Sequence, residues 1–328
     1  MPEISVIIPL YNKAAFISRA LNSVLSQTVQ DFEIVVVDDG STDGSLHAIE
    51  AIGDPRLRVI RQANAGPGAA RNHGLRQSTA PYVVFLDADD EILPEFVERG
   101  LANLKRNPTC ALSASDRLIG PNRERDTLPC TIRIPHGVWR MPANADLEVM
   151  SWASYSIGPA TMCQKRPIEE LGGFYENKCL FGEDVYLWIQ ILLHYSIFRD
   201  PTPLAWYHSE DSELNLHHTQ QGKVNWHELR RKRPLLPTLT DPNPIRARCP
   251  APYQALLERY LAYGALSEAL TRASIGDNET ARRLRERYPS MKMFRWGFAK
   301  LHAKLALPRI SAGLTAIRRL FGPRFPLS

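Results

Sequence analysis

Strongly hydrophobic runs alternate with amphipathic segments through the first hundred residues of this 328-residue chain. The β-branched run at the start of ISVIIPLYN (4–12), stopped by Pro9, predicts a buried strand, and AAFISRALNSVLSQ (14–27) places its apolar residues on one face of a helix. Three further strands are predicted within FEIVVVD (32–38), LRVIR (57–61) and PYVVFL (81–86), each followed by helix-forming sequence. Continuous apolar strands separated by helices predict an α/β fold with a mainly parallel, doubly wound sheet.

The pattern becomes less regular after the first hundred residues. Residues 117–145 are rich in Arg and Pro and predict an irregular excursion, and a short helix is expected near 146–153. The segment 166–196 predicts two helices separated by a Gly-Gly turn and a loop. Two strand-like pieces, SIFRD (196–200) and LAWYHS (204–209), follow, and helical sequence interrupted by Pro dominates from about residue 222. We therefore expect an α/β domain over residues 1–220 and a helical C-terminal region over residues 221–328.

The net charge of +5 conceals an asymmetry along the chain. From Ala281 to the end, twelve Lys or Arg residues oppose one acid, whereas the preceding 280 residues carry a net charge of −6. The helical region is therefore basic from about residue 281, and the two parts are expected to have different partners.

Cysteine usage and hydropathy restrict the class of protein further. The five cysteines are scattered without a C-x-x-C pair, which indicates neither a disulfide framework nor a zinc site and favours a reducing compartment. The sequence lacks the pattern of a signal peptide and has no apolar run of about 18 residues. We expect a chain that is neither exported nor threaded through a bilayer.

Polar residues follow three of the four predicted strands. They are Tyr11 and Asn12, then Asp38 and Asp39, then Asp87 and Asp89. In an open parallel sheet the carboxyl ends of the strands form the ligand-binding edge, so these side chains are expected to converge there. A D-x-D pair at a strand end can bind Mg²⁺ or Mn²⁺ through oxygen. The alternative is that the acids of the DADDE run cap the helix expected near Pro94.

Six motifs occur in a fixed order: SVIIPLYN, VVVDDGSTDGS, NAGPGAARNHGL, VVFLDADD, LGGF and GEDVYLW. In this order the chain resembles glycosyltransferase family 2, the inverting nucleotide-sugar transferases of GT-A fold, over roughly residues 3–210. The resemblance implies a Rossmann-like GT-A domain, followed here by the helical, basic extension. It also implies a nucleoside-diphosphate sugar donor, usually a UDP-sugar, and Mn²⁺ or Mg²⁺ held between the D-x-D acids and the diphosphate.

The same resemblance assigns donor-binding roles to individual residues. Pro9, Tyr11 and Asp39 match positions that hold the nucleobase, with Tyr11 stacking on the ring and Asp39 accepting from its N–H. Arg71 matches a donor-contacting Arg, Asp87 the ribose-contacting acid, and Asp89 the metal ligand. Plainer alternatives are strand-end packing for Tyr11, helix capping for Asp38 and Asp39, and a solvated helix face for Arg71.

The resemblance places catalysis in the E-D motif. Glu183 and Asp184 match it, and Asp184 is the expected base that takes a proton from the acceptor hydroxyl as that hydroxyl attacks the anomeric carbon. The alternative is an acidic N-terminus for the following helix. The Gly172-Gly173-Phe174 turn matches the acceptor side and is also compatible with a helix C-cap. His208 matches a polar or metal-contacting position only loosely, and we favour a hydrogen-bonded structural histidine.

The implied activity is hexosyl or N-acetylhexosaminyl transfer to a glycan or lipid-linked acceptor, in bacterial cell-surface polysaccharide or glycoconjugate synthesis. The basic tail, residues 281–328, mixes aromatic and Leu residues with Lys and Arg, as do helices that lie in a membrane interface. We therefore expect a cytoplasmic enzyme that is peripheral on an anionic inner membrane surface. The alternative is that the tail packs on the catalytic domain.

The sequence supports three alternative functions less well. A dinucleotide-dependent oxidoreductase requires G-x-G-x-x-G after the first strand, whereas the G-x-G here, Gly66 to Gly68, follows the third. A catalytically inactive nucleotide-sugar-binding or scaffold protein of the same fold stays open, although the presence of both acid motifs argues against it. Nucleic-acid binding is disfavoured because the tail contains no recognisable nucleic-acid module.

Overall fold

The computed structural model describes residues 1–125, 134–155, 157, 160–177, 179, 181–211 and 234–306. The chain divides into two compact units, each described here by itself. Unit 1 comprises Met1–Gly222 with Leu236–Tyr253, and unit 2 comprises Lys223–Leu235 with Gln254–Ser328. Residues 236–253 therefore belong with the α/β unit. The assignment of catalysis to residues 1–220 stays a prediction.

Unit 1 is built on a single sheet, in which the described residues contribute ten strands. Eight of them follow the order β3-β2-β1-β4-β9-β6-β10-β5, while β7 pairs with β6 and β8 with β10. The bounds are β1 Ile4–Leu10, β2 Phe32–Asp38, β3 Leu57–Arg61, β4 Tyr82–Phe85, β5 Glu91–Ile92, β6 Cys110–Ile119, β7 Glu124–Arg125, β8 Gly137–Trp139, β9 Thr161–Gln164 and β10 Ser196–Tyr207.

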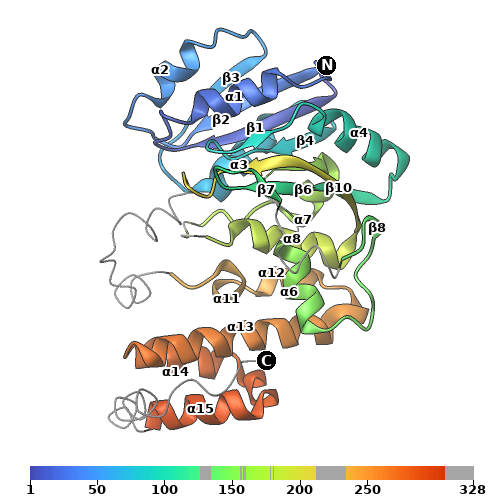
Figure 1. The fold of residues 1–328 in the computed structure, drawn as a ribbon. Helices are drawn as coiled ribbons and strands as arrows, with labels where there is room; N and C mark the ends of the chain where they lie inside the picture. The colour runs from blue at the N-terminus through green and yellow to red at the C-terminus, as the bar shows by residue number, and fades with distance from the viewer. Residues whose placement is uncertain are drawn as a thin grey trace. The chain divides into compact units, whose positions relative to one another are not determined.

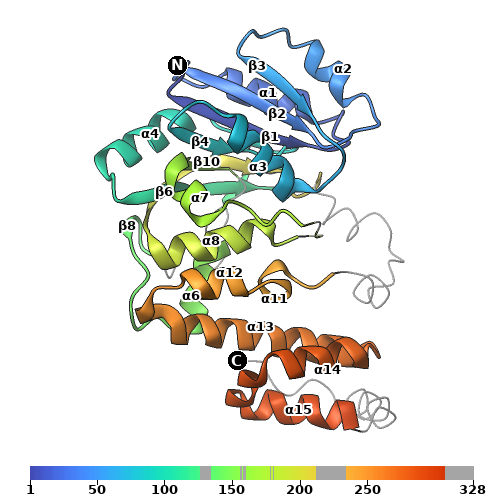
Figure 2. The same cartoon turned by 180° about the vertical axis from the view of Figure 1, so that it is seen from behind.

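The first four strands in this order are parallel, which confirms the expected α/β fold class. Strand β9 then runs antiparallel to both β4 and β6, so the complete sheet is mixed. Helices α1 (Ile17–Leu25) and α4 (Phe96–Arg106) cover one face of the parallel part, while α3 (Pro67–Gln77) lies on the other (Figures 1 and 2). This is the layering that a doubly wound sheet requires.

Alternation along the strands explains which residues each helix covers. Ile34 and Val36 of β2 belong to the core under α1 and α4, whereas Val35 and Val37 pack with Ala70 of α3 on the opposite face. Gly74 lets α3 approach the sheet closely, because a Cβ there would lie 2.4 Å from the Cγ2 of Ile7. Both faces are therefore buried, as the continuous apolar runs predicted.

The other helices in the described part of unit 1 are α2 Ser45–Glu50, α6 Leu147–Tyr155, α7 Lys165–Leu171, α8 Glu183–His194, α11 Pro237–Thr240, α12 Asn243–Arg248 and the 3-10 helix η1 Ala251–Tyr253. Two local predictions are wrong. The excursion expected over 117–145 begins as the end of β6 and includes β7 and β8, and the two strand pieces expected after residue 195 form the single strand β10. Residues 126–133 of that excursion lie outside the described residues.

Unit 2 is helical in its described part. It contains α13 Gln254–Ser274, α14 Asn278–Arg287, the 3-10 helix η2 Pro289–Met293 and α15 Arg295–Ala306. Helix α15 packs closely on α13, since a Cβ on Gly297 would lie 2.7 Å from the Cδ2 of Leu266. Among the described residues, none of the helices combines the length and apolar character needed to cross a membrane.

Candidate active site

The carboxyl ends of β1, β2 and β4 meet at one edge of the sheet. In the parallel register Leu10 pairs with Asp38, and Ile7 pairs with Phe85. The residues that follow these strands therefore emerge together, as the sequence predicted. Tyr11 leaves this edge with 43% of its surface exposed, while Pro9 is half-buried within β1.

Asp39 anchors the Gly-rich loop that precedes α3. Its Oδ1 accepts hydrogen bonds from the backbone N–H of Ala65 and from Nε2 of Gln62, both at 2.8 Å, and its Oδ2 accepts from Gly66 N–H at 2.8 Å. The side chain is buried. Since a carboxylate has about four lone-pair sites, these three bonds leave Oδ2 able to accept one further donor.

Arg71 joins the D-x-D strand end to the E-D motif. Its Nη2 donates to Asp87 Oδ1 at 2.6 Å, and its Nη1 donates to Glu183 Oε1 at 2.7 Å. The guanidinium also lies 5.3 Å from the ring centroid of Phe174. Although burial opposes its charge, Asp87 and Glu183 hold the pKa of Arg71 above its ordinary value. The side chain is buried, so the alternative of a solvated helix face is wrong.

The neighbouring Asn72 fastens the Gly-Gly turn to the same helix. Phe174 N–H donates to Asn72 Oδ1, and Asn72 Nδ2 donates to the carbonyl oxygen of Phe174, each at 2.8 Å. Gly172 is the left-handed C-cap of α7 at φ +86°, as one interpretation of the sequence expected. Gly173 must stay small, because a Cβ there would lie 2.4 Å from Asn72 Oδ1. A role for this turn on the acceptor side stays a prediction.

Glu183 and Asp184 occupy the first turn of α8 and differ in their surroundings. Glu183 is held by Arg71, whereas Asp184 is half-buried and accepts a hydrogen bond from Val185 N–H at 2.7 Å. Burial, followed by the charge of Glu183, raises the pKa of Asp184 to about 6. A carboxylate that titrates close to neutral pH has the basicity expected of a general base.

A thiol also lies beside this pair. The Sγ of Cys179 is 3.9 Å from Glu183 Oε2. Burial and then the charge of Glu183 raise the pKa of the Cys179 thiol to about 12. The thiol is therefore protonated near neutral pH, and a thiolate nucleophile is not available at this position.

The acids after β4 form a crowded carboxylate cluster. Asp89 Oδ2 accepts from Lys13 Nζ at 2.8 Å, and buried Asp90 accepts from the backbone N–H of His208 at 3.0 Å. Burial raises the pKa of both carboxyls, and the charge of Asp87 raises it further, although Lys13 opposes the shift at Asp89. Helix α4 begins only at Phe96, so these acids do not cap it.

This cluster fits a hard divalent cation. Within the part of the chain that the structure describes, Asp90 Oδ2 is buried without a hydrogen-bond partner. Carboxylate oxygens of this kind are the ligands that Mg²⁺ and Mn²⁺ prefer. The metal role of Asp89, whose Oδ2 is paired with Lys13, stays a prediction.

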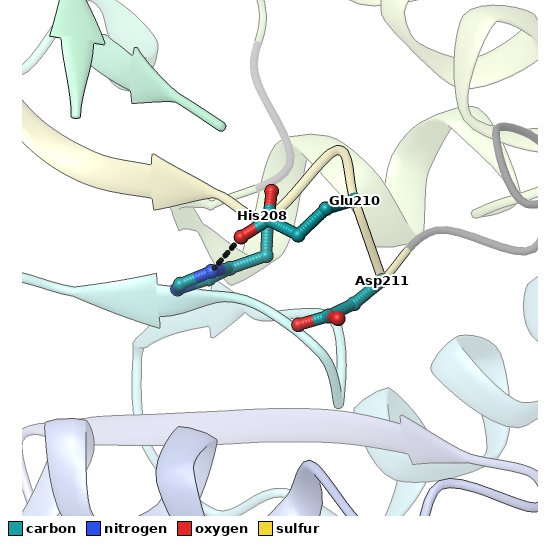
Figure 3. Close-up of side chains that lie close together, drawn as sticks. All are labelled: His208, Glu210 and Asp211. Carbon is teal, nitrogen blue, oxygen red and sulfur yellow. Dashed lines mark hydrogen bonds and ion pairs between the residues drawn. The ribbon is translucent and has the colours of Figure 1, made fainter. Parts of the chain in front are cut away.

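A second group of ligating side chains follows β10 (Figure 3). His208, Glu210 and Asp211 each offer one ligand atom, and these atoms all lie within 4.8 Å of one another. The His208 ring is already engaged, with Nδ1 3.0 Å from Glu210 Oε1 and Nε2 2.8 Å from Glu91 Oε1. Arg19 donates to Asp211 at 2.8 Å and to the carbonyl oxygen of Asp89. The histidine is thus hydrogen-bonded, as favoured from the sequence.

Sequence reasoning missed Lys13, Arg19, Glu210 and Asp211. Lys13 directly follows the SVIIPLYN motif, and Glu210 and Asp211 come shortly after His208, so their polarity was visible in the sequence. Their partners were not, because the pairing of Glu91 with Trp206 depends on β10 lying antiparallel to β5. Contacts of this kind follow from the order of strands in the sheet and not from local pattern.

Similarity to known proteins was found at three levels. The family described as "Glycosyl transferase family 2" matches residues 5–171. An uncharacterized glycosyltransferase of Nostoc sp. is 49% identical over 100 residues, which is 30% of this chain and 31% of the relative. The uncharacterized glycosyltransferase YibD of Escherichia coli is 42% identical over 98 residues, 29% of this chain and 28% of the relative. The match thus spans less than a third of either relative.

Solved structures match over nearly the whole chain. S. aureus TarS in complex with UDP has a TM-score of 0.61 at 18% identity, covering 100% of this chain and 94% of that one. The mannosyltransferase PcManGT from Pyrobaculum calidifontis, in complex with GDP-Man and Mn²⁺, has a TM-score of 0.54 at 19% identity, covering 98% and 87%. At these identities the likeness shows a common fold.

Proposed function

Because the chain belongs to glycosyltransferase family 2 and has the GT-A fold, we propose that it is an inverting glycosyltransferase acting on a nucleoside-diphosphate sugar. The observation that carries the proposal is the bridge made by Arg71, which brings the D-x-D strand end and the E-D motif into one site. A UDP-sugar is the favoured donor, and S. aureus TarS, which shares the fold, has been solved with UDP and with UDP-GlcNAc. We propose hexosyl or N-acetylhexosaminyl transfer from such a donor.

The proposed mechanism uses a different residue for each task. Tyr11 and Pro9 flank the nucleobase, and Asp39 accepts from its N–H while keeping the Gly-rich loop in place. Arg71 orients Asp87 toward the ribose. Asp184 removes the proton from the acceptor hydroxyl during its attack on the anomeric carbon, so the product has inverted configuration. A general base suffices for this displacement, so no covalent enzyme nucleophile is required.

We also propose that the site uses Mn²⁺ or Mg²⁺. Asp89 would hold the ion, and Asp90 offers a further oxygen in the same cluster. When bound, the ion supplies positive charge to the diphosphate as it leaves. PcManGT, which shares the fold, has been solved with Mn²⁺.

A donor screen tests the proposed activity. Wild-type protein is incubated with nucleotide sugars and MnCl₂ while release of nucleoside diphosphate is followed, and the anomeric configuration of the product is read by NMR. Release with inversion supports the proposal, and retention of configuration contradicts direct displacement. Tight donor binding without turnover on any glycan or lipid-linked acceptor would favour the inactive binding or scaffold alternative. Bacterial envelope polysaccharide or glycoconjugate intermediates are the acceptors to try first.

Asp39→Ala is expected to weaken UDP binding about tenfold, because one charge-assisted hydrogen bond to the base contributes about 1.5 kcal/mol. Two nucleotides separate this role from loop anchoring. Uracil presents an N–H where cytosine presents an acceptor, so the preference for UDP over CDP should collapse in the variant. Isothermal titration with both nucleotides measures it. Equal losses of UDP and CDP affinity would show that Asp39 only holds the loop.

Among the described residues of the basic tail, one exposed patch of unit 2 is suited to contact a membrane. Leu301 and Leu305 of α15 are buried, whereas Trp296 is 86% exposed and lies near exposed Lys292 and Arg295. Residues 307–328 lie outside the described residues, and with them the tail positions Arg309, Leu314, Arg318, Arg319, Leu320, Phe321 and Arg324. We propose that Trp296 and its basic neighbours dock the enzyme on an anionic, cytoplasmic membrane face.

Lys292→Gln with Arg295→Gln is expected to weaken binding to phosphatidylglycerol liposomes about 30-fold, because each basic residue near an anionic surface contributes about 1 kcal/mol. Co-sedimentation at fixed ionic strength measures the change. Lys105→Gln with Arg106→Gln, an exposed basic pair at the end of α4, is the matched control and should bind as wild type does. Equal binding by both double variants would rule out this patch.

A further inference from the structure

A lysine of the chain already occupies the carboxylate that the proposed function assigns to the metal. Lys13 Nζ lies 2.8 Å from Asp89 Oδ2, and the two side chains are only 14% and 17% exposed. Lys13 comes from the loop after β1, whereas Asp89 follows β4, so the fold and not local sequence brings them together. The ammonium also lies 5.7 Å from the ring centroid of Phe16.

The backbone at Lys13 is fixed by the loop that follows β2. Asn12 N–H and Lys13 N–H donate to the hydroxyl oxygens of Ser41 and Ser45, each at 3.0 Å. Ala14 N–H donates to Asp43 Oδ2 at 3.0 Å. The loop thus holds the chain at Lys13 just before α2, whose N-cap residue is Gly44.

Asn12 completes this attachment. Its side-chain Oδ1 accepts from Thr42 N–H at 2.8 Å, and its φ of +51° is a conformation that few residues other than Gly adopt. The main chain on both sides of Lys13 is therefore held in place, and only the flexible side chain can leave Asp89.

The two acids of the D-x-D motif are neutralised in different ways. Asp87 pairs with Arg71, which is itself anchored to Glu183 through a second nitrogen. Asp89 pairs with the ammonium of Lys13, which ends an unbranched side chain. A guanidinium held by two carboxylates is a fixed part of the site, whereas a lysine ammonium is a point charge on a mobile side chain. The Lys13 pair is the one suited to exchange.

We propose that Lys13 acts as an internal counter-ion that competes with the divalent cation for Asp89. The ammonium and the cation repel each other, so each weakens the binding of the other to the same carboxylate. The cation therefore binds the donor-free protein weakly. The diphosphate of the donor strengthens binding of the cation, because it adds oxygen ligands and accepts the displaced ammonium of Lys13. By linkage, nucleotide and cation then strengthen each other's binding. This inference rests on the proposed metal-dependent function.

Mn²⁺ binding tests the inference without reference to turnover. Free Mn²⁺ is measured by electron paramagnetic resonance during titration of the full-length protein with MnCl₂, with and without UDP. Lys13→Met keeps the length of the side chain and removes its charge. It is expected to bind Mn²⁺ about 10-fold more tightly without UDP, because the competing charge is gone. The gain in Mn²⁺ affinity that UDP produces should shrink correspondingly.

Two controls accompany this variant. Lys13→Arg keeps the charge and should bind Mn²⁺ as wild type does. Lys165→Met removes a lysine of similar exposure, 18%, that lies 3.6 Å from Glu169 and follows β9, and it should also leave Mn²⁺ binding unchanged. Melting temperature is a second readout, since added MnCl₂ should raise it more for Lys13→Met than for wild type.

The possible outcomes distinguish failure of the counter-ion role of Lys13 from failure of the proposed metal-dependent function. If wild type binds Mn²⁺ with UDP and Lys13→Met shows no gain without UDP, the counter-ion role is wrong and the metal-dependent function stands. If neither wild type nor Lys13→Met binds Mn²⁺ even with UDP, the metal-dependent function fails and the inference fails with it. A gain shared equally by Lys165→Met would also overturn the inference.

Discussion

Asp184→Asn is expected to lower kcat by about 10²- to 10⁴-fold, the usual contribution of a general base. The amide keeps the size of the carboxylate and can still accept from Val185 N–H, so the start of α8 should be preserved. UDP affinity should stay close to wild type, because the base acts only when the acceptor hydroxyl is attacked. Single-turnover kinetics and UDP titration measure the two quantities separately.

Glu183→Gln is the comparison variant. Glu183 is held by Arg71, so its loss should disturb the donor side and weaken UDP binding more than it slows the chemical step. Normal turnover by Asp184→Asn together with an inactive Glu183→Gln would identify Glu183 as the base instead.

The protonation state of Asp184 is expected to determine how kcat/KM depends on pH. Burial raises the pKa of Asp184 to about 6, and only the deprotonated form can accept a proton. kcat/KM should therefore be constant above this pKa and fall about tenfold per pH unit below it. The acid limb should be absent from the residual activity of Asp184→Asn. A limb that survives unchanged in that variant would belong to another group.

Asp89→Asn is expected to lower the rate of transfer by about three orders of magnitude, because several kcal/mol of charge stabilisation are lost with the metal anchor. Excess EDTA should stop the wild-type enzyme, and MnCl₂ should restore it. The amide can still accept from Lys13, which limits structural damage. Full turnover in excess EDTA would contradict the metal-dependent proposal.

Asp211→Asn distinguishes the two groups of ligating side chains. Asp211 belongs to the group with His208 and Glu210, and it pairs with Arg19. If the D-x-D cluster holds the ion, Asp211→Asn should retain most of its activity and its Mn²⁺ affinity. A larger loss of Mn²⁺ affinity in Asp211→Asn than in Asp89→Asn would place the ion at the His208 group.

The sequence predicted the parts of the fold that depend on local periodicity. Strand β1 could be located because its apolar residues form a continuous run, and helix α1 because its apolar residues repeat with the helical period. The direction of β9 could not be predicted, since TMCQ (161–164) has the same character in a parallel or an antiparallel strand. The continuity of β10 was hidden by Pro201 and Pro203, where its register with β6 shifts.

The candidate site shows the same limit. The order of the motifs indicated which acids and which Arg belong to the candidate site. It did not indicate that Arg71 bonds to both Asp87 and Glu183. Those contacts join residues 16 and 112 positions apart in the chain. The choice of Lys13 as the partner of Asp89 likewise required the registers of β1 and β4.

Arg71 and Asn72 are consecutive in α3, yet they hold different parts of unit 1. One bonds to the acid motifs, and the other bonds to both backbone groups of Phe174. A fluctuation that lifts this turn of α3 therefore releases Asp87, Glu183 and the Gly-Gly turn together. In the language of native-state hydrogen exchange, these segments form one cooperative opening unit. The two acids and the Gly-Gly turn are then expected to lose their structure together.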